Sequence, residues 1–220
     1  MPETTWIASN TAVEAPKKAD LALDWIKKNR ETFIGSIVIL LAAGIFGVYF
    51  FMHYRDLRET AWKNLFMAQQ AGFSGGTQQA MEQLGAIETS YGNTSAAPFA
   101  TLTKGDILFS QAKFKEAAAE YGKLANAGPE LAPVAIYNQG KCKEAEGDLA
   151  GAQAAYADIL ARFPEHFIVP EAHYSQARAQ EISGGLEMAK ANYEKIVLLY
   201  PETSWAAQAK ARLTRPQPKK

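Results

Sequence analysis

The longest run of apolar positions in the chain covers residues 33–52, about twenty residues without a charged side chain. A helix of that length is about 30 Å long at roughly 1.5 Å per residue, which matches the hydrocarbon thickness of a bilayer. The pattern therefore predicts one membrane-spanning helix. A cleaved signal peptide is the alternative, although its apolar part usually has about 7–15 residues, and here about thirty residues precede a longer run.

The segments before the predicted span are polar or amphipathic. Residues 1–18 are polar and small, and we expect them to form a disordered, cytoplasmic N-terminus. Residues 19–32 place Leu21, Trp25 and Ile26 on one side of a short helix, which predicts a segment lying on the membrane surface. Five basic residues lie within about twenty positions before the span and three after it. This difference favours a cytoplasmic N-terminus and places the remaining chain on the other side of the membrane.

Small residues interrupt the predicted span. Such residues let the backbones of two membrane helices approach closely. The candidate positions for contact with a partner helix are Gly35, Ala43, Gly44 and Gly47.

Residues 55–213 are rich in Ala, Glu, Lys, Leu and Gln and are broken at intervals by Gly and Pro. Because no stretch alternates apolar and polar positions as a strand would, this part is predicted to be all-helical. It also repeats internally: a small residue, an alanine, a tyrosine and a proline recur after 35 residues and again after a further 37. The three sets are Gly105, Ala117, Tyr121 and Pro129, then Gly140, Ala152, Tyr156 and Pro164, then Ala177, Ala189, Tyr193 and Pro201.

This repetition predicts a series of helical hairpins. In each hairpin, the two helices would cross where the small residue of the first helix meets the alanine of the second. The tyrosine would fill the gap between neighbouring hairpins, and the proline would end the second helix. The predicted units cover residues 60–96, 97–131, 132–168 and 169–203, with Ser74-Gly75-Gly76 as the turn of the first. A capping helix over residues 204–213 and a frayed tail over 214–220 would follow.

The segment AIYNQGKCKEAEGDLAGAQAAYADILARFP at residues 135–164 resembles the tetratricopeptide repeat. The resemblance covers residues 60–201 and implies an all-α solenoid in which the first helices of the hairpins line a concave surface that binds protein partners. The lining positions that it implies are Trp62, Leu65, Gln69, Phe99, Leu102, Asp106, Phe109, Val134, Tyr137, Lys141, Glu144, Glu171, Tyr174, Arg178 and Glu181.

The layout of the chain resembles a narrower group. The similarity lies in the polar N-terminus, in the segment WIKKNRETFIG before the span, and in the segment HYRDLRETAWKNLFMAQQA, which leads into degenerate repeats. This layout is similar to that of the ancillary subunit family of the bacterial Sec translocon. That resemblance implies a single-pass inner-membrane protein with a periplasmic repeat domain, whose partners include secretion-channel subunits, periplasmic chaperones and unfolded clients.

Charge and composition argue against other classes of function. The chain has 23 basic and 23 acidic residues, five of each before Arg55, so the repeat domain is neutral and an unlikely binder of nucleic acid. Cys142 is the only cysteine, which excludes an internal disulfide. Lys141 and Lys143 beside it could lower the pKa of the thiol, but a small core residue is the simpler interpretation.

No motif predicts a catalytic centre. Pro170 separates His166 from His173, which argues against a shared metal site on one helix, and we expect neither metal nor cofactor. The first hypothesis is therefore a non-catalytic, membrane-anchored chaperone or adaptor for exported polypeptides at the secretion channel. A scaffold that links cell-wall or outer-membrane assembly factors is the alternative, and an enzyme or its regulatory subunit is the third.

Overall fold

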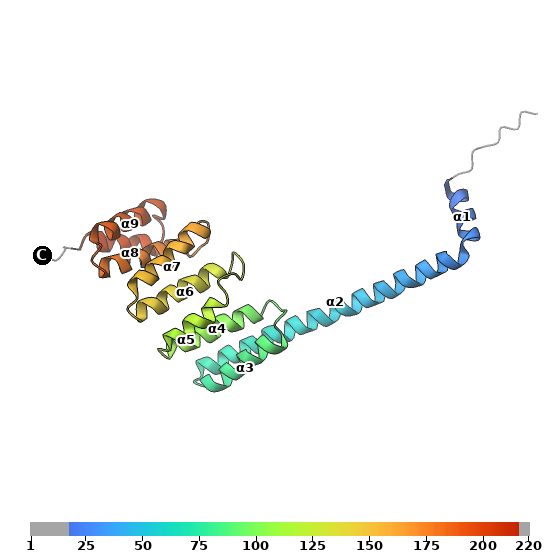
Figure 1. Ribbon diagram of the computed structural model, residues 1–220, viewed down its shortest axis with the longest axis horizontal. Coiled ribbons are helices and arrows are strands. Elements are labelled where there is room, and N and C mark those ends of the chain that lie inside the picture. The colour runs from blue at the N-terminus through green and yellow to red at the C-terminus, as the bar shows by residue number, and fades with distance from the viewer. Residues whose placement is uncertain (1–17, 216–220) are drawn as a thin grey trace, which may run out of the picture. The chain divides into compact units, whose positions relative to one another are not determined.

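The computed structural model describes residues 18–215, and within them all regular structure is helical, in ten helices (Figure 1). The expected disorder of residues 1–17 and the expected fraying of residues 216–220 lie outside the described residues. The described chain divides into two compact units, the first ending at Arg55 and the second beginning at Asp56.

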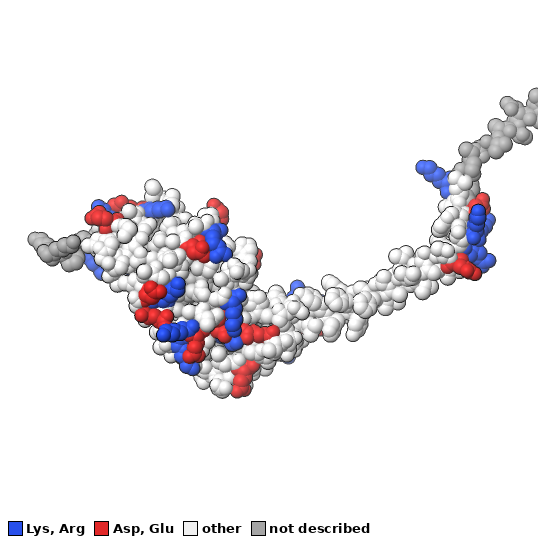
Figure 2. Space-filling model, in the orientation of Figure 1, with Lys and Arg blue, Asp and Glu red and all other residues white. Residues whose placement is uncertain are grey.

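The first unit contains α1 (Lys18–Lys28) and the beginning of α2 (Arg30–Phe73). The middle of α2 carries no charged side chain, as Figure 2 shows, and it is long and apolar enough to cross a membrane by length and composition. A membrane anchor and a signal sequence near the N-terminus share this character. The predicted span forms only part of α2, because no glycine or proline interrupts the chain between residues 48 and 71 and the helix continues to Phe73.

The second unit is a row of helical hairpins that follow one another along the chain (Figure 1). The all-α fold with stacked hairpins is therefore confirmed. The end of α2 pairs with α3, α4 with α5, α6 with α7 and α8 with α9, and a last helix, α10, follows. Their bounds are α3 (Thr77–Ser90), α4 (Ala97–Ser110), α5 (Phe114–Gly122), α6 (Ala132–Ala145), α7 (Leu149–Arg162), α8 (Val169–Ile182), α9 (Leu186–Leu199) and α10 (Ser204–Leu213).

The turns inside the four hairpins share one backbone conformation. At three of them a glycine has a positive φ: Gly75 at 89°, Gly147 at 82° and Gly184 at 83°. Residues without a side chain adopt this left-handed conformation readily, which is why glycine commonly ends a helix. The equivalent position of the second hairpin is Ala112, whose φ is 59°. Ala112 is the one described non-glycine residue with a positive φ, so the turn of the second hairpin is more strained than the other three turns.

The repeated tyrosines pack inside their own hairpins, which corrects one prediction. A β-carbon at Gly105 would lie 2.4 Å from Cε1 of Tyr121, and one at Gly140 would lie 2.5 Å from Cε1 of Tyr156. The glycine therefore makes room for the tyrosine ring and not for the alanine of the second helix. The ring of Tyr156 also joins a core cluster with Ile168 of the next hairpin, so it contacts the neighbouring unit as expected.

The prolines end two of the three second helices. α7 ends directly before Phe163 and Pro164, and α9 ends directly before Tyr200 and Pro201. The prediction for Pro129 is wrong, because α5 already ends at Gly122. After it, the amides of Leu124 and Ala127 bond to the carbonyls three residues earlier, at 2.9 Å each, so the chain continues in tight turns.

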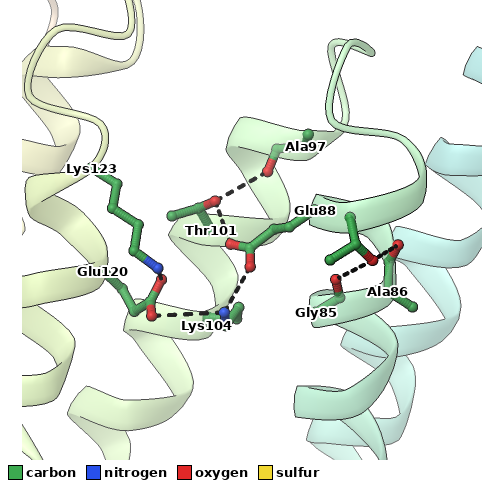
Figure 3. Close-up of polar contacts among 9 residues, drawn as sticks. Gly85, Ala86, Glu88, Ala97, Thr101, Lys104, Glu120 and Lys123 are labelled. Atoms are coloured by element: carbon green, nitrogen blue, oxygen red, sulfur yellow. Dashed lines mark hydrogen bonds and ion pairs between the residues drawn. The ribbon is translucent and has the colours of Figure 1, made fainter.

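A polar network joins the first hairpin to the second (Figure 3). Lys104 of α4 donates a hydrogen bond of 2.7 Å to Glu88 of α3 and forms an ion pair of 3.7 Å with Glu120 of α5. Thr101 donates to the other oxygen of Glu88 at 2.6 Å, and Lys123 pairs with Glu120 at 2.6 Å. Burial alone would raise the pKa of Glu88, but the hydrogen bonds from Lys104 and Thr101 lower it overall.

Candidate functional site

A groove of about 590 Å³ lies on the side of the repeat domain formed by the first helices of successive hairpins. Its walls come from α4, α6, α8 and α10, and we call it the concave groove. It is lined by Phe109, Tyr137, Lys141, Glu144, Ala145, Glu171, Tyr174, Ser175, Arg178, Trp205, Gln208 and Arg212.

Aromatic rings form the floor of the concave groove. Tyr137 and Tyr174 are 7% and 8% exposed, so each presents little more than a ring edge. The hydroxyl groups of Tyr137 and Ser175 lie 3.0 Å apart, which joins α6 to α8. The rings of Tyr174 and Trp205 have centroids 5.4 Å apart, which joins α8 to α10. These contacts fix a rigid apolar surface at the base of the groove.

Charged side chains occupy the sides of the groove. Arg178 of α8 is hydrogen-bonded to Glu144 of α6, and Arg212 of α10 lies 3.5 Å from Glu181 of α8. Lys141 places its ammonium group 5.2 Å from the centroid of the Phe109 ring and 5.9 Å from that of Tyr137. Among the described residues no ion pair holds Lys141, and its ammonium group lies over aromatic faces instead.

Burial holds Tyr137, on the floor of the groove, in its neutral form. It raises the pKa of Tyr137, and nearby carboxylates such as Glu171 add to the effect. The pKa of Tyr156, beneath the groove, rises for the same reason. The hydroxyl of Tyr156 and one oxygen of Glu144 are buried without a hydrogen-bond partner in the described part of the chain. Tyr137 therefore serves as a neutral packing and hydrogen-bonding group, and Tyr156 as a neutral packing group.

A second hollow of about 410 Å³ lies at the end of α2 and along α4. Asp106 lines it and accepts a hydrogen bond of 2.7 Å from the hydroxyl of Tyr121. Burial raises the pKa of Asp106, against the opposing effects of that hydrogen bond and of Lys141. Phe73, which is 91% exposed, also lines this hollow.

The structure gathers about half of the expected lining positions into the concave groove. Seven of the fifteen line it: Phe109, Tyr137, Lys141, Glu144, Glu171, Tyr174 and Arg178. Asp106 and Gln69 line the second hollow, and Val134 packs against the core. Glu181 lies outside the groove lining and accepts a hydrogen bond of 2.8 Å from the hydroxyl of Tyr193.

The first two hairpins depart most from the expected lining. Leu65 is 3% exposed and belongs to the core with Ala61 and Ala68, because these three residues share the face of α2 that packs inward. Leu102 is partly buried against the neighbouring core cluster. Trp62 and Phe99 are 40% exposed and form an aromatic pair with centroids 5.2 Å apart.

Sequence reasoning missed the contribution of α10. It treated residues 204–213 as a cap, whereas Trp205, Gln208 and Arg212 line one wall of the groove. The available signal was an aromatic, an amide and a cation at helical spacing, which place three groove-forming side chains on one face. The four small residues of the predicted span remain a prediction; β-carbons built at Gly35, Gly44 and Gly47 meet no atom of the described chain within 4 Å.

Cys142 and His173 are core residues. Cys142 is fully buried, and burial raises the pKa of its thiol to about 11, so the neighbouring lysines do not activate it. His173 is 5% exposed, and burial, with a smaller effect of Lys195, lowers its pKa to about 4. Among the described residues, no group of three or more His, Cys, Asp or Glu side chains is arranged to hold a metal ion.

Comparison with known proteins identifies the repeat. Residues 134–166 match the family described as tetratricopeptide repeat. No curated protein sequence matches the chain. The solved structure of a tetratricopeptide repeat protein from Parabacteroides merdae is similar over 73% of this chain at 20% identity, with a TM-score of 0.56. That match covers 58% of the Parabacteroides protein, so this chain spans less than two thirds of its length.

A second solved structure contains nearly identical TPR-like repeats from Podosopora anserina, described as those of a kinesin light chain. It is similar over 71% of this chain and 84% of its own, at 16% identity and a TM-score of 0.55. At these identities the likeness concerns the fold. Together with the family match, it shows that the second unit is an array of tetratricopeptide-like repeats.

Proposed function

We propose that this chain is a membrane-anchored, non-catalytic protein-interaction module that binds a polypeptide segment of its partner in the concave groove. The observation that carries the proposal is the groove itself, in which Tyr137, Tyr174 and Trp205 form an aromatic floor beside partly exposed cations. Aromatic and arginine side chains in a concave surface are typical anchors for protein partners. Tetratricopeptide-like repeats imply protein partners as well.

The chemistry of the groove favours binding over catalysis. Its two arginines are already engaged by carboxylates, and Tyr137 is held neutral by burial. A catalytic group needs a pKa matched to proton transfer or an activated nucleophile. The one cysteine is buried below the surface with a pKa of about 11. These features support a surface that recognises a shape and a charge pattern.

We infer that α2 anchors the module in the inner membrane of a bacterium with the N-terminus in the cytoplasm. The inference is supported by the apolar stretch of α2, whose side chains are exposed, and by the basic residues that precede it. In this arrangement the repeat domain lies in the periplasm. The small residues at Gly44 and Gly47 then offer a surface on which a second membrane helix could pack.

The narrower role that we propose is that of an adaptor or chaperone at the secretion channel, which receives exported polypeptides. It is supported by the resemblance of the chain layout to the ancillary subunit family of the Sec translocon. A scaffold for cell-wall or outer-membrane assembly factors is the second candidate, because the same anchored groove would serve a folded envelope protein with an extended segment.

Site-specific photocrosslinking tests this proposal. A photoreactive amino acid is placed at Gln208, which is exposed in the groove, and in a second variant at Gly44 of the span. Capture of secretion-channel subunits from Gly44 and of exported polypeptides from Gln208 is expected. Capture of wall-synthesis or outer-membrane assembly proteins alone would replace the secretory role with the scaffold role.

The orientation has its own test. In a Cys142→Ala background, a Ser74→Cys variant places one thiol at the exposed turn of the first hairpin. A membrane-impermeant maleimide should label it in cells whose outer membrane alone has been permeabilised. Protection of this thiol until the inner membrane is lysed would reverse the topology and remove the secretory role.

A further inference from the structure

The cations of the concave groove come from successive first helices. Lys141 and Arg178 each directly follow the repeated small residue of their hairpin, Gly140 and Ala177, so they occupy the same register position in α6 and α8. The neighbouring helix α10 contributes Arg212. The groove therefore presents one cation for each of three neighbouring helices.

The acids of this region are more shielded than the cations. The side chain of Glu144 is 11% exposed and is covered by Arg178, whose own side chain is 43% exposed. Glu181 is bound by both Tyr193 and Arg212. An arginine has five N–H donors, so Arg178 and Arg212 can each hold their internal carboxylate and still donate to a ligand.

Two groove charges have no ion pair among the described residues, and they differ in position. Lys141 is exposed and stands over two aromatic faces. Glu171 lies in the first turn of α8, seven residues before Arg178, which is about 10 Å along a helix. The start of a helix favours a carboxylate, which accounts for Glu171 at that place. Glu171 is therefore about two turns from Arg178 and lies instead near Tyr137, whose pKa it helps to raise.

The spacing of the cations limits the form of a matching ligand. Helices that pack against one another have axes about 8–10 Å apart. The contacts from Tyr137 to Ser175 and from Arg212 to Glu181 join α6 to α8 and α8 to α10, so a ligand that meets all three cations crosses these helices in that order. An extended polyproline-type chain rises about 3.1 Å per residue and has three residues per turn, so every third side chain faces the same way about 9 Å apart.

We infer that the concave groove takes an extended, acidic polypeptide segment that carries a carboxylate at about every third residue, with apolar side chains between them. The inference deepens the proposed function and rests on it. The carboxylates face Lys141, Arg178 and Arg212, and the intervening apolar side chains contact the rings of Tyr137, Tyr174 and Trp205. Charge complementarity thus selects which segments of a partner enter the groove.

Binding of synthetic peptides to the full chain in detergent micelles tests this inference. The first peptide has glutamate at every third position with proline and leucine between. Two others replace each glutamate with glutamine or with lysine, and a fourth groups the glutamates at one end. Three partly exposed ion pairs predict that the first peptide binds about tenfold more tightly than the glutamine and lysine peptides. High salt should remove most of this difference, and grouping the glutamates should weaken binding.

Variants of Lys141 identify the place of binding, because this residue has no ion pair whose loss would disturb the fold. Lys141→Gln should weaken the glutamate peptide about 2- to 5-fold and leave the glutamine peptide unchanged, while Lys141→Arg should retain binding. The control is Lys115→Gln, an exposed residue of α5 outside the groove, which should change neither affinity.

The outcomes separate the two levels of the proposal. If the glutamine or lysine peptide binds as tightly as the glutamate peptide and crosslinks to Gln208, or if Lys141→Gln has no effect, the inference of an acidic ligand is overturned and the proposed binding groove stands. Equal affinity for the grouped peptide would overturn the every-third spacing. If no peptide of any charge binds or crosslinks to Gln208, the proposed function falls together with the inference.

Discussion

The ring of Tyr156 occupies the space where a side chain at Gly140 would be, since a β-carbon there would lie 2.5 Å from ring atom Cε1. Tyr156 is fully buried, and its centroid lies 5.4 Å from that of Tyr137 on the floor of the concave groove. The position of one groove residue therefore depends on a glycine that lies outside the lining of the groove.

This relationship predicts the effect of Gly140→Ala. Alanine would gain about 1 kcal/mol of helix propensity, but the overlap with the ring costs more, so we expect a net loss of about 1–2 kcal/mol in the free energy of unfolding. Chemical denaturation measures it. The control is Gly85→Ala, in the interior of α3 with no atom within 4 Å of the added carbon, which should stabilise the protein. Equal effects of the two substitutions would contradict the packing described.

The strained turn at Ala112 makes a prediction of the opposite sign. Ala112 has a positive φ at the position that Gly75, Gly147 and Gly184 occupy in the other hairpins. Ala112→Gly should therefore raise the free energy of unfolding by up to about 1 kcal/mol, whereas Gly147→Ala should lower it by a similar amount. Thermal unfolding of both variants checks the pair, and a destabilised Ala112→Gly protein would show that the turn is not strained.

The polar network between the first two hairpins predicts a local effect of Lys104→Met. The Lys104 side chain is 14% exposed, and its loss leaves the mostly buried carboxylates of Glu88 and Glu120 without this partner. We expect a loss of about 2–3 kcal/mol in stability and faster hydrogen exchange in α3. In Lys123→Met, a 55% exposed partner is removed, and the expected loss is below about 1 kcal/mol. A Lys104→Met protein that exchanges as slowly as wild type in α3 would show that the network does not hold the first hairpin.

Burial of His173 predicts an acid-sensitive stability. Its pKa is lowered from 6.5 to about 4, so at pH values between these the unfolded chain binds a proton that the folded chain does not. The free energy of unfolding should therefore fall as the pH drops from 6.5 to about 4, by about 3 kcal/mol from this residue, and this contribution should change no further below pH 4. Carboxylates titrate in the same range, so the readout is the difference between the wild type and His173→Gln. Equal pH dependence of the two proteins would contradict the assignment.

The sequence predicts the hairpins well because their signals are local. The small residue, tyrosine and proline of each unit recur at fixed spacing, and Gly75, Gly147 and Gly184 mark the turns. The first hairpin lacks this pattern, so the lining positions assigned there include Leu65, which the inward face of α2 buries. Ala61, Leu65 and Ala68 are spaced four and three residues apart, which is the spacing of one helix face. This spacing would have predicted that Leu65 lies in the core.

The groove was only half predictable for a different reason. Positions on α4, α6 and α8 follow from the repeat, but Trp205 and Arg212 of α10 enter the groove through contacts with Tyr174 and Glu181 of α8. The helical spacing of these residues places them on one face of α10, but the helix against which that face packs depends on the tertiary arrangement of the array. The end of α5 at Gly122 is similar, because a run of tight turns replaces the helix that a proline was expected to end.

The central claim is that partners enter the concave groove, and a comparison of crosslinking yields tests it most directly. One variant carries the photoreactive residue at Gln208 in the groove, and its control carries it at Ala157, an exposed position of α7 outside the groove lining. In intact membranes the groove position should give at least about tenfold more crosslinked partner, in keeping with one occupied site. Equal yields, or a higher yield from Ala157, would contradict the assignment of the groove as the binding surface.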